Sequence, residues 1–361
     1  MKDASHRDGT TEIERALRHI VVSTRSTAKS CAARRASGEL THVFRNVLVH
    51  TAYLADAPDR WDAARRVSAA RICAVGVVLS PEWILLGQGA AFVHGLELTT
   101  DLFDVHVGRP GDIHRRSDPL PSITIPAGAP AAGVVPPARL IRHQTSLDEE
   151  HLIGSDMGIR LPDLATTAAL CARDLAAREA SVIVSGALGV MSSFNRFHDH
   201  VAASRVREEA IRSEVTERLS RMPSTRGCRK ARAVIAAADA ACESVPERVL
   251  VWILRAAGFT RIDTQVHHRV GGRDYYVDVE LAPGIALESD SRGKHETSGE
   301  AAADVHRSYE RQASRQKALE SIGLVVVRFS PAEYDDPDAV VAEIVRKCRI
   351  VPPPPVRLLR P

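Results

Sequence analysis

Residues 273–290 have the sequence RDYYVDVELAPGIALESD, and this stretch decides the fold of the second half of the chain. Runs of apolar and β-branched residues on either side of 282–284 predict two strands. The Ala-Pro-Gly sequence at 282–284 predicts a three-residue hairpin loop with a left-handed glycine. We therefore expect an antiparallel strand pair over 275–281 and 285–290.

The register of this hairpin would gather acidic side chains on one face. A three-residue loop pairs Leu281 with Ile285, although proline is unfavourable at the second loop position. Asp278 then lies opposite Glu288. Asp290 follows Glu288 by two residues and shares its face of the strand. Because like charges this close raise one another's pKa, we expect a cation among these three carboxylates.

Oxygen ligands favour a hard cation, so Mg²⁺ (or Mn²⁺) suits this cluster better than zinc. Such a metal leaves positions for water and a phosphate oxygen, as phosphodiester hydrolysis requires. His295 would add a proton-transfer group, or it is an exposed loop histidine. On the following helix, Arg311, Arg315 and Lys317 would bind phosphates, or they form a solvated face.

Other elements complete an αβββαβα order over residues 244–350. Ser244-Val245-Pro246-Glu247 precedes an apolar-periodic stretch that stops at Gly258, which predicts a helix. In that helix Glu247 is either an acid of the site or a cap on the backbone amide of Ser244. The remaining elements are strands at 264–270 and 324–329 and helices at 301–322 and 337–350. A polyproline run at 352–355 should be extended and end the fold.

This part of the chain resembles the endonuclease-like domain related to very-short-patch mismatch-repair endonucleases, a branch of the PD-(D/E)xK fold. The motifs that carry the resemblance are SVPE at 244–247, Gln265, VDV at 277–279, LESD at 287–290 with His295, residues 315–323 and VVVR at 325–328.

The resemblance implies a role for each acidic position. Asp278 would be the central metal ligand, Glu288 the second acidic position and Glu247 the helix acid. Asp290 and His295 would be the loop-side groups. Many family members have glycine where this chain has Ser291, and the wider fold has lysine where it has Asp290, although the short-patch branch does without that lysine.

Residues 1–50 are predicted to form a winged helix-turn-helix-like head. Helical periodicity at 11–20 and 26–36 precedes a β-rich run at 43–49. The alternative is a plain helical cap whose arginines are solvated. The basic and polar residues expected on the helix and wing are Arg25, Lys29, Arg34, Arg35, His42 and Arg45.

The front of the chain is similar to the AbiEi-like type IV antitoxin family. The similarity lies in residues 38–49, in GAAFVHGL at 89–96 and in residues 158–175. The residue pattern over 51–190 predicts an α/β middle domain, in which a Pro-, Gly- and Ala-rich stretch at 110–137 should be loop-like. The similarity assigns 89–96 to this domain. It also implies DNA binding, repression and a cognate toxin as a partner.

A basic helical connector is expected over 191–243. Nine basic residues stand against four glutamates between Ser204 and Ala233. Such a helix can track phosphates, or it can be a solvated helix with internal ion pairs. His198 and His200 lack further ligands at useful spacing and are expected in a surface loop.

Composition excludes several classes of protein. The 48 basic and 45 acidic residues leave a net charge of only +3, which does not by itself identify a partner. The longest apolar run is far shorter than a membrane span needs, and the N-terminus lacks a signal-peptide core. Six scattered cysteines contain no CxxC pair, so we expect no disulfide framework and a cytoplasmic location.

We therefore expect an α/β (α+β) protein with five segments and a metal-dependent DNA endonuclease activity. The alternative is a non-enzymatic antitoxin-like regulator that keeps the nuclease fold as a scaffold. The sequence leaves the oligomeric state open. The segments are the head at 1–50, the middle domain at 51–190, the connector at 191–243, the endonuclease-like domain at 244–350 and the tail at 351–361.

Overall fold

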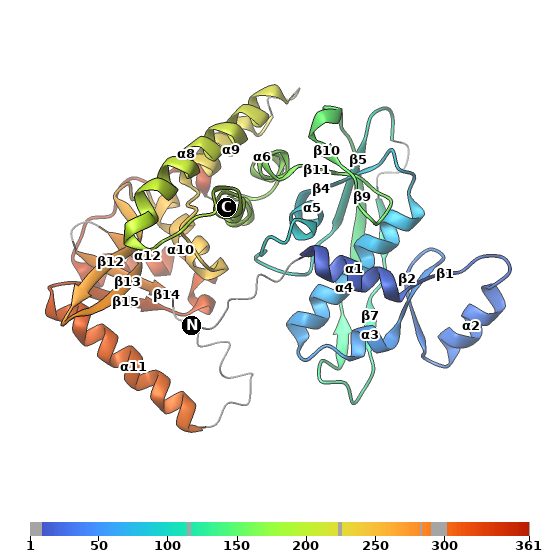
Figure 1. Ribbon diagram of the computed structural model, residues 1–361, viewed down its shortest axis with the longest axis horizontal. Coiled ribbons are helices and arrows are strands. Elements are labelled where there is room, and N and C mark those ends of the chain that lie inside the picture. Colours follow the sequence, from blue (N-terminus) through green and yellow to red (C-terminus); the bar gives the residue numbers. More distant parts are fainter. Residues whose placement is uncertain (1–8, 114–116, 223–225, 282–283, 290–301, 361) are drawn as a thin grey trace. The chain divides into compact units, whose positions relative to one another are not determined.

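The computed structural model describes residues 9–113, 117–222, 226–281, 284–289 and 302–360; at 9–10, 198 and 302–311 it describes the backbone (Figure 1). The fold is mixed α/β, and the chain divides into two compact units, 1–171 and 172–361. These units are coarser than the five expected segments, and the finer division stays a prediction. Within the described residues, no helix is both long and apolar enough to cross a membrane.

The first unit begins with two helices around a small antiparallel sheet. A single helix lies in the region 26–36, which was expected to be helical, and the expected β-rich run is a hairpin with a two-residue turn. The strand order is β1-β3-β2, and Cys31, Leu40 and Leu48 form its small core. The elements are α1 (Gly9–His19), β1 (Ile20–Val22), α2 (Ala28–Ala36), β2 (Leu40–Phe44) and β3 (Val47–His50).

The rest of this unit is built on a second sheet of order β4-β5-β9-β6, in which β5 and β9 are parallel. The helices and strands are α3 (Thr51–Ala55), α4 (Arg60–Val78), β4 (Ile84–Leu86), α5 (Gly87–Val93), β5 (Val105–Arg109), β6 (Ser117–Leu120), β7 (Ile123–Ile125), β8 (Gly133–Val135), β9 (Ala138–Gln144), β10 (Leu152–Ile153), β11 (Leu161–Pro162) and α6 (Leu164–Asp174).

The loop expected over 110–137 is wrong in part, because β6, β7 and β8 lie there. Proline is tolerated in β6 because that strand is at the edge of its sheet. The buried Arg71 of α4 donates hydrogen bonds to the carbonyls of Pro121 (2.8 Å) and Pro136 (2.7 Å). One guanidinium thereby fixes both ends of the segment that carries β7 and β8.

Four helices open the second unit, namely α7 (Ala177–Ser192), α8 (His198–Arg221), α9 (Cys228–Ala237) and α10 (Val245–Ala256). The expected connector is therefore helical, as predicted. The surface loop expected at His198 and His200 is wrong, since both residues lie in the first turn of α8. A backbone turn ahead of α8 ends at Phe197, whose carbonyl accepts the amide of Val201 at 3.0 Å and so starts the helix.

A four-stranded sheet of order β12-β13-β14-β15 follows. β12, β13 and β14 are antiparallel neighbours, whereas β14 and β15 are parallel and joined through α11. Both α10 and α12 pack on the sheet and on each other. The observed order is therefore αβββαβα. Its elements are β12 (Ile262–Val270), β13 (Arg273–Leu281), β14 (Ile285–Ser289), α11 (Ala302–Ser321), β15 (Val325–Phe329) and α12 (Pro337–Cys348).

The proline-rich tail does not end the fold but returns to α10. The amide of Val356 donates to the carbonyl of Ala256 at 2.8 Å, and the indole of Trp252 donates to the carbonyl of Leu359 at 3.0 Å. A Cβ at the left-handed Gly258 (φ +93°) would lie 2.1 Å from the carbonyl oxygen of Pro354. Glycine is therefore required where the tail crosses the end of α10.

Replacing Leu359 by alanine tests this docking. Its side chain is 3% exposed, so Leu359→Ala should lower the free energy of unfolding by about 2 to 4 kcal/mol in urea denaturation. Leu358 is 39% exposed, and Leu358→Ala should change stability by less than about 0.5 kcal/mol. Equal effects of the two substitutions would show that the tail does not dock through Leu359.

Candidate functional site

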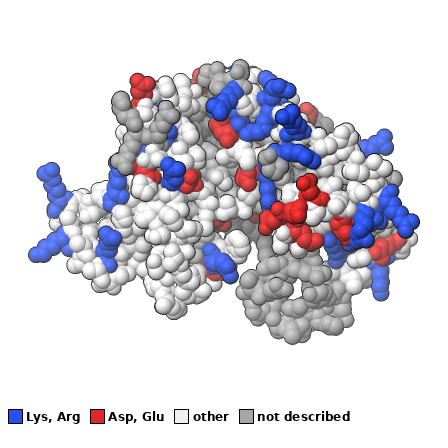
Figure 2. All heavy atoms as spheres, turned by 180° about the vertical axis from the view of Figure 1, so that it is seen from behind, with Lys and Arg blue, Asp and Glu red and all other residues white. Residues whose placement is uncertain are grey.

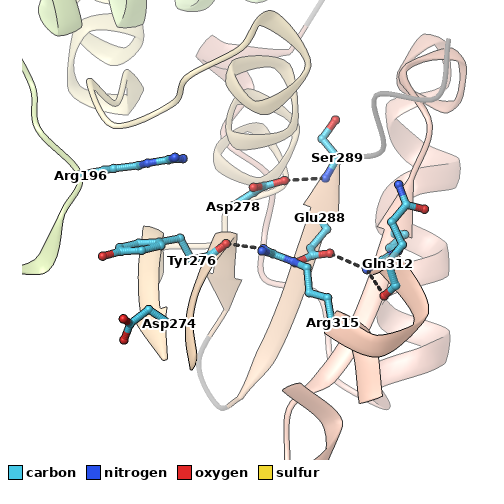
Figure 3. A pocket seen from close by; sticks show the side chains of 9 residues that line it. Arg196, Asp274, Tyr276, Asp278, Glu288, Ser289, Gln312 and Arg315 are labelled. Carbon is cyan, nitrogen blue, oxygen red and sulfur yellow. Dashed lines mark hydrogen bonds and ion pairs between the residues drawn. The ribbon is translucent and has the colours of Figure 1, made fainter. Parts of the chain in front are cut away.

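A pocket of about 300 Å³ opens over the strand ends of the second unit's sheet (Figure 3). Its walls come from β13, β14, β15, α11 and the segment before α8. Acidic and basic side chains face one another across it, with polar groups between them. The lining residues are Asp274, Asp278, Glu288, Arg196, Arg315, Arg328, Tyr276, Ser289 and Gln312.

The predicted hairpin register is confirmed. Leu281 pairs with Ile285, and the loop ends at a left-handed Gly284 (φ +76°). The same ladder brings Asp278 and Glu288 together, and both line the pocket. Loop length and glycine conformation, both visible in the sequence, are sufficient to set this neighbourhood.

Asp278 is a half-buried carboxylate whose charge is poorly compensated. Its Oδ2 accepts the backbone amide of Ser289 at 3.0 Å. Burial, which has the largest effect, and the negative charges of Glu247 and then Glu288 together raise the pKa of Asp278 to about 7, against the opposing effects of the Ser289 amide and Arg315. Near neutral pH, Asp278 is thus poised between its protonated and ionised forms.

Glu288 is compensated by arginines. Arg315 Nε donates to Glu288 Oε1 at 2.7 Å, and an Arg328 guanidinium nitrogen donates to Oε2 at 2.9 Å. Figure 3 shows Arg315 reaching from α11 to Glu288 and to the carbonyl of Tyr276. Arg315 was expected to bind phosphates, but here it is paired with an acid. The positive charge expected from a metal is therefore supplied in part by the protein.

Glu247 holds the start of α10 and also reaches the neighbouring sheet. Its Oε2 accepts the amide of Glu243 (2.9 Å) and the side-chain amide of Gln265 (3.0 Å), while its Oε1 accepts the hydroxyl of Ser244 (2.7 Å). The expected cap on the Ser244 amide is therefore wrong, because the carboxylate binds the amide one residue earlier. Glu247 affects the site in two ways: its charge raises the pKa of Asp278, and it accepts a hydrogen bond from Gln265.

Gln265 has an unusual backbone at the position opposite Asp278. It adopts a left-handed conformation (φ +52°) in β12, while Thr264 pairs with Val279 and Val266 with Val277. Strain of this kind persists only where the surroundings fix it, and it concentrates at functional sites. The Gln265 side chain is 3% exposed, and Arg196 donates to its Oε1 at 3.2 Å.

The donor chemistry fits a hard cation, since two carboxylates meet in one pocket and one of them has a raised pKa. Glu288 is not free to bind a cation, because both of its carboxylate oxygens accept hydrogen bonds from guanidinium groups. Asp290 and His295 lie outside the described residues. Among those described, three ligand groups lie within 4.8 Å of one another at Asp148, Glu150 and His151 in the first unit, and not at Asp278 and Glu288.

The predicted DNA-binding residues of the head fall into two groups. Arg25, Lys29 and Arg35 are exposed on or beside α2. Arg34 instead pairs with Glu39 at 2.5 Å, and Arg45 lies 3.5 Å from Asp118. His42 binds the carbonyl of Arg45 at 2.8 Å, within the hairpin.

On α11, Lys317 is exposed. The backbone of Arg311 lies in the same helix, and its side chain is outside the described residues.

The basic connector is largely ion-paired. On α8, four arginines contact glutamates three or four residues away, and Arg207 donates to the carbonyl of Ser192. Of the two predictions for this helix, the contacts support a helix with internal ion pairs rather than a row of unpaired arginines that could bind phosphates. Acidic side chains also lie among the basic ones on the face drawn in Figure 2.

The sequence analysis assigns no role in the site to Arg328, Arg196 or Tyr276. Arg328 could have been found, because it is the charged residue of the apolar run VVVRF at 325–329, and β14 and β15 pair it with Glu288. Arg196 and Tyr276 come from distant segments, and nothing in their local patterns links them. Arg196 lies over the rings of Phe197 and Tyr276 at the pocket mouth.

Comparison with known proteins gives no relative for this chain: no family model, no curated protein and no solved structure matches it. The site is therefore interpreted from its own geometry.

The raised pKa of Asp278 predicts a pH dependence of stability. The folded protein holds a proton on Asp278 up to about pH 7, whereas an unfolded chain releases it near 3.8, so this group stabilises the fold at low pH and the contribution is lost as pH rises to 7. Asp278→Asn should remove this part of the decline in unfolding free energy between about pH 4 and pH 7, measured by urea denaturation.

The control is Asp263→Asn, which changes an exposed aspartate on the neighbouring strand β12. It should leave the decline as in the wild type. An unchanged decline in Asp278→Asn would mean that Asp278 is ionised across the whole range.

Proposed function

We propose that the second unit is an endonuclease-like unit that hydrolyses phosphodiester bonds of DNA with Mg²⁺ (or Mn²⁺), while the head binds DNA. The observation that carries the proposal is that Asp278 and Glu288, which come from neighbouring strands, line the same pocket. The αβββαβα order and the resemblance to the short-patch endonuclease branch support it.

Each pocket residue has a role in this proposal. Asp278 and Glu288 would hold the cation, which supplies an electrophile for the phosphate and an acidified water when bound. Arg196 and Arg315 would orient the phosphate at the mouth of the pocket, since guanidinium groups match phosphate oxygens. Glu247 is a positioning residue that fixes Gln265 beside Asp278.

The head supports the DNA-binding part of the proposal. Helix α2 buries only Cys31 among its residues, so the rest of its surface is open to a partner. Lys29 and Arg35 project from this surface, as on a helix that enters a DNA groove. The same observation favours the alternative function, an antitoxin-like regulator without cleavage that binds operator DNA and a cognate toxin.

Nicking of supercoiled and mismatched duplex DNA in Mg²⁺ or Mn²⁺ tests the endonuclease. Asp278→Asn and Glu288→Gln should each lower the nicking rate by at least about 100-fold, because each removes a charged ligand of the cation. Arg346→Gln, which removes an exposed charge from α12 outside the pocket, should retain most of the rate. Absence of nicking by the wild type would contradict the proposal.

Retention of the same duplex on a native gel separates the two functions. Binding should survive Asp278→Asn and weaken in Lys29→Ala and Arg35→Ala, whose charges face solvent on α2. Binding of this kind without any nicking by the wild type would favour the regulator.

A further inference from the structure

We propose that Arg315 is a latch on Glu288, and that a DNA phosphate opens it. In the free protein Arg315 occupies the carboxylate that would bind the cation. A phosphodiester entering the pocket draws Arg315 away and frees Glu288. DNA and the divalent cation therefore bind this pocket cooperatively, an inference that rests on the proposed function and adds its regulation.

The latch follows from the contacts of Glu288. This carboxylate is 7% exposed, and each of its oxygens accepts a guanidinium nitrogen within 3 Å. A divalent cation placed beside two guanidinium groups is repelled strongly at such low exposure. At least one arginine must leave before Glu288 can become a ligand.

The two arginines are not equivalent. Arg328 is fixed by the parallel pairing of β14 and β15, which sets it opposite Glu288, and it also donates to the carbonyl of Gln312 at 3.2 Å. Its side chain is 17% exposed. Arg315 reaches across from α11 and also donates to the carbonyl of Tyr276, but its side chain is 32% exposed, so a phosphate in the pocket can reach it. Arg315 is therefore the arginine that can exchange its partner.

The pocket has room for the phosphate that would replace Glu288 as the partner of Arg315. Arg315 and Asp278 both line it, together with Arg196 at the mouth. A phosphate offers Arg315 the same two-oxygen geometry as a carboxylate and carries a charge that is not already shared with Arg328. Once Arg315 has moved to the phosphate, Arg328 still neutralises one oxygen of Glu288, and Oε1 faces the cation.

Cooperativity of this kind is reciprocal. If the phosphate raises the affinity for the cation, the cation raises the affinity for DNA by the same factor. The free protein would thus bind Mg²⁺ weakly in the absence of nucleic acid.

The test is a Mn²⁺ titration of the full chain, followed by electron paramagnetic resonance, with and without a phosphorothioate DNA duplex that is cut slowly. The duplex should increase the Mn²⁺ affinity of the wild type about tenfold or more. Arg315→Gln should bind Mn²⁺ without DNA about as tightly as the wild type does with DNA, and the duplex should then add less than about twofold. The matched control Arg346→Gln, which changes an exposed arginine of α12 that does not line the pocket, should behave like the wild type.

Two results would overturn the latch: a wild-type Mn²⁺ affinity that the duplex leaves unchanged, or an Arg315→Gln affinity no higher than that of the free wild type. The wild-type comparison remains decisive if Arg315→Gln does not fold. Failure of the latch alone would leave nicking that still depends on Glu288. If the proposed function itself is wrong, the wild type should neither nick DNA nor bind Mn²⁺.

Discussion

Asp278 and Glu288 lie on neighbouring strands, where their negative charges repel each other. The groups around the pocket compensate this repulsion. Leu281 pairs with Ile285 beside a left-handed Gly284, and this register brings acids of both strands to one pocket. Glu247 brings a third negative charge close enough to raise the pKa of Asp278. Three acids in a buried region require compensation.

Each acid is compensated in a different way. Glu288 receives guanidinium groups from Arg315 and Arg328, and Glu247 receives backbone and side-chain hydrogen bonds. Asp278 receives one backbone amide, and its pKa rises to about 7. Asp278 is thus the acid whose charge the protein compensates least. A bound cation would supply the positive charge that Asp278 lacks. This poorly compensated carboxylate distinguishes the pocket from an ordinary ion-pair network.

Local rules predicted much of this arrangement. Loop length and glycine conformation set the hairpin, and the apolar periodicity of the flanking segments set the order of helices and strands. Contacts between distant segments were beyond such rules. The pairing of Glu288 with Arg315 depends on how α11 lies on the sheet, and the left-handed Gln265 depends on Glu247 and Arg196. The sequence around Glu288 or Gln265 does not show which distant residues will pack against it.

Errors elsewhere in the chain have the same origin. The tail was expected to end the fold because proline disfavours helix and sheet, yet the buried Trp252 and Leu359 bring it back to α10. The segment 110–137 looked loop-like from its composition, yet the buried Arg71 holds it against α4. In both places a tertiary contact of one large side chain outweighs local preference.

The most direct measurement is anomalous X-ray scattering from crystals of the full chain grown with Mn²⁺ and a phosphorothioate duplex. We expect a manganese peak bound by the carboxylates of Asp278 and Glu288, with the Arg315 guanidinium turned from Glu288 to a phosphate. A structure with DNA and manganese in which Arg315 still holds Glu288, and no peak lies at Asp278, would contradict it.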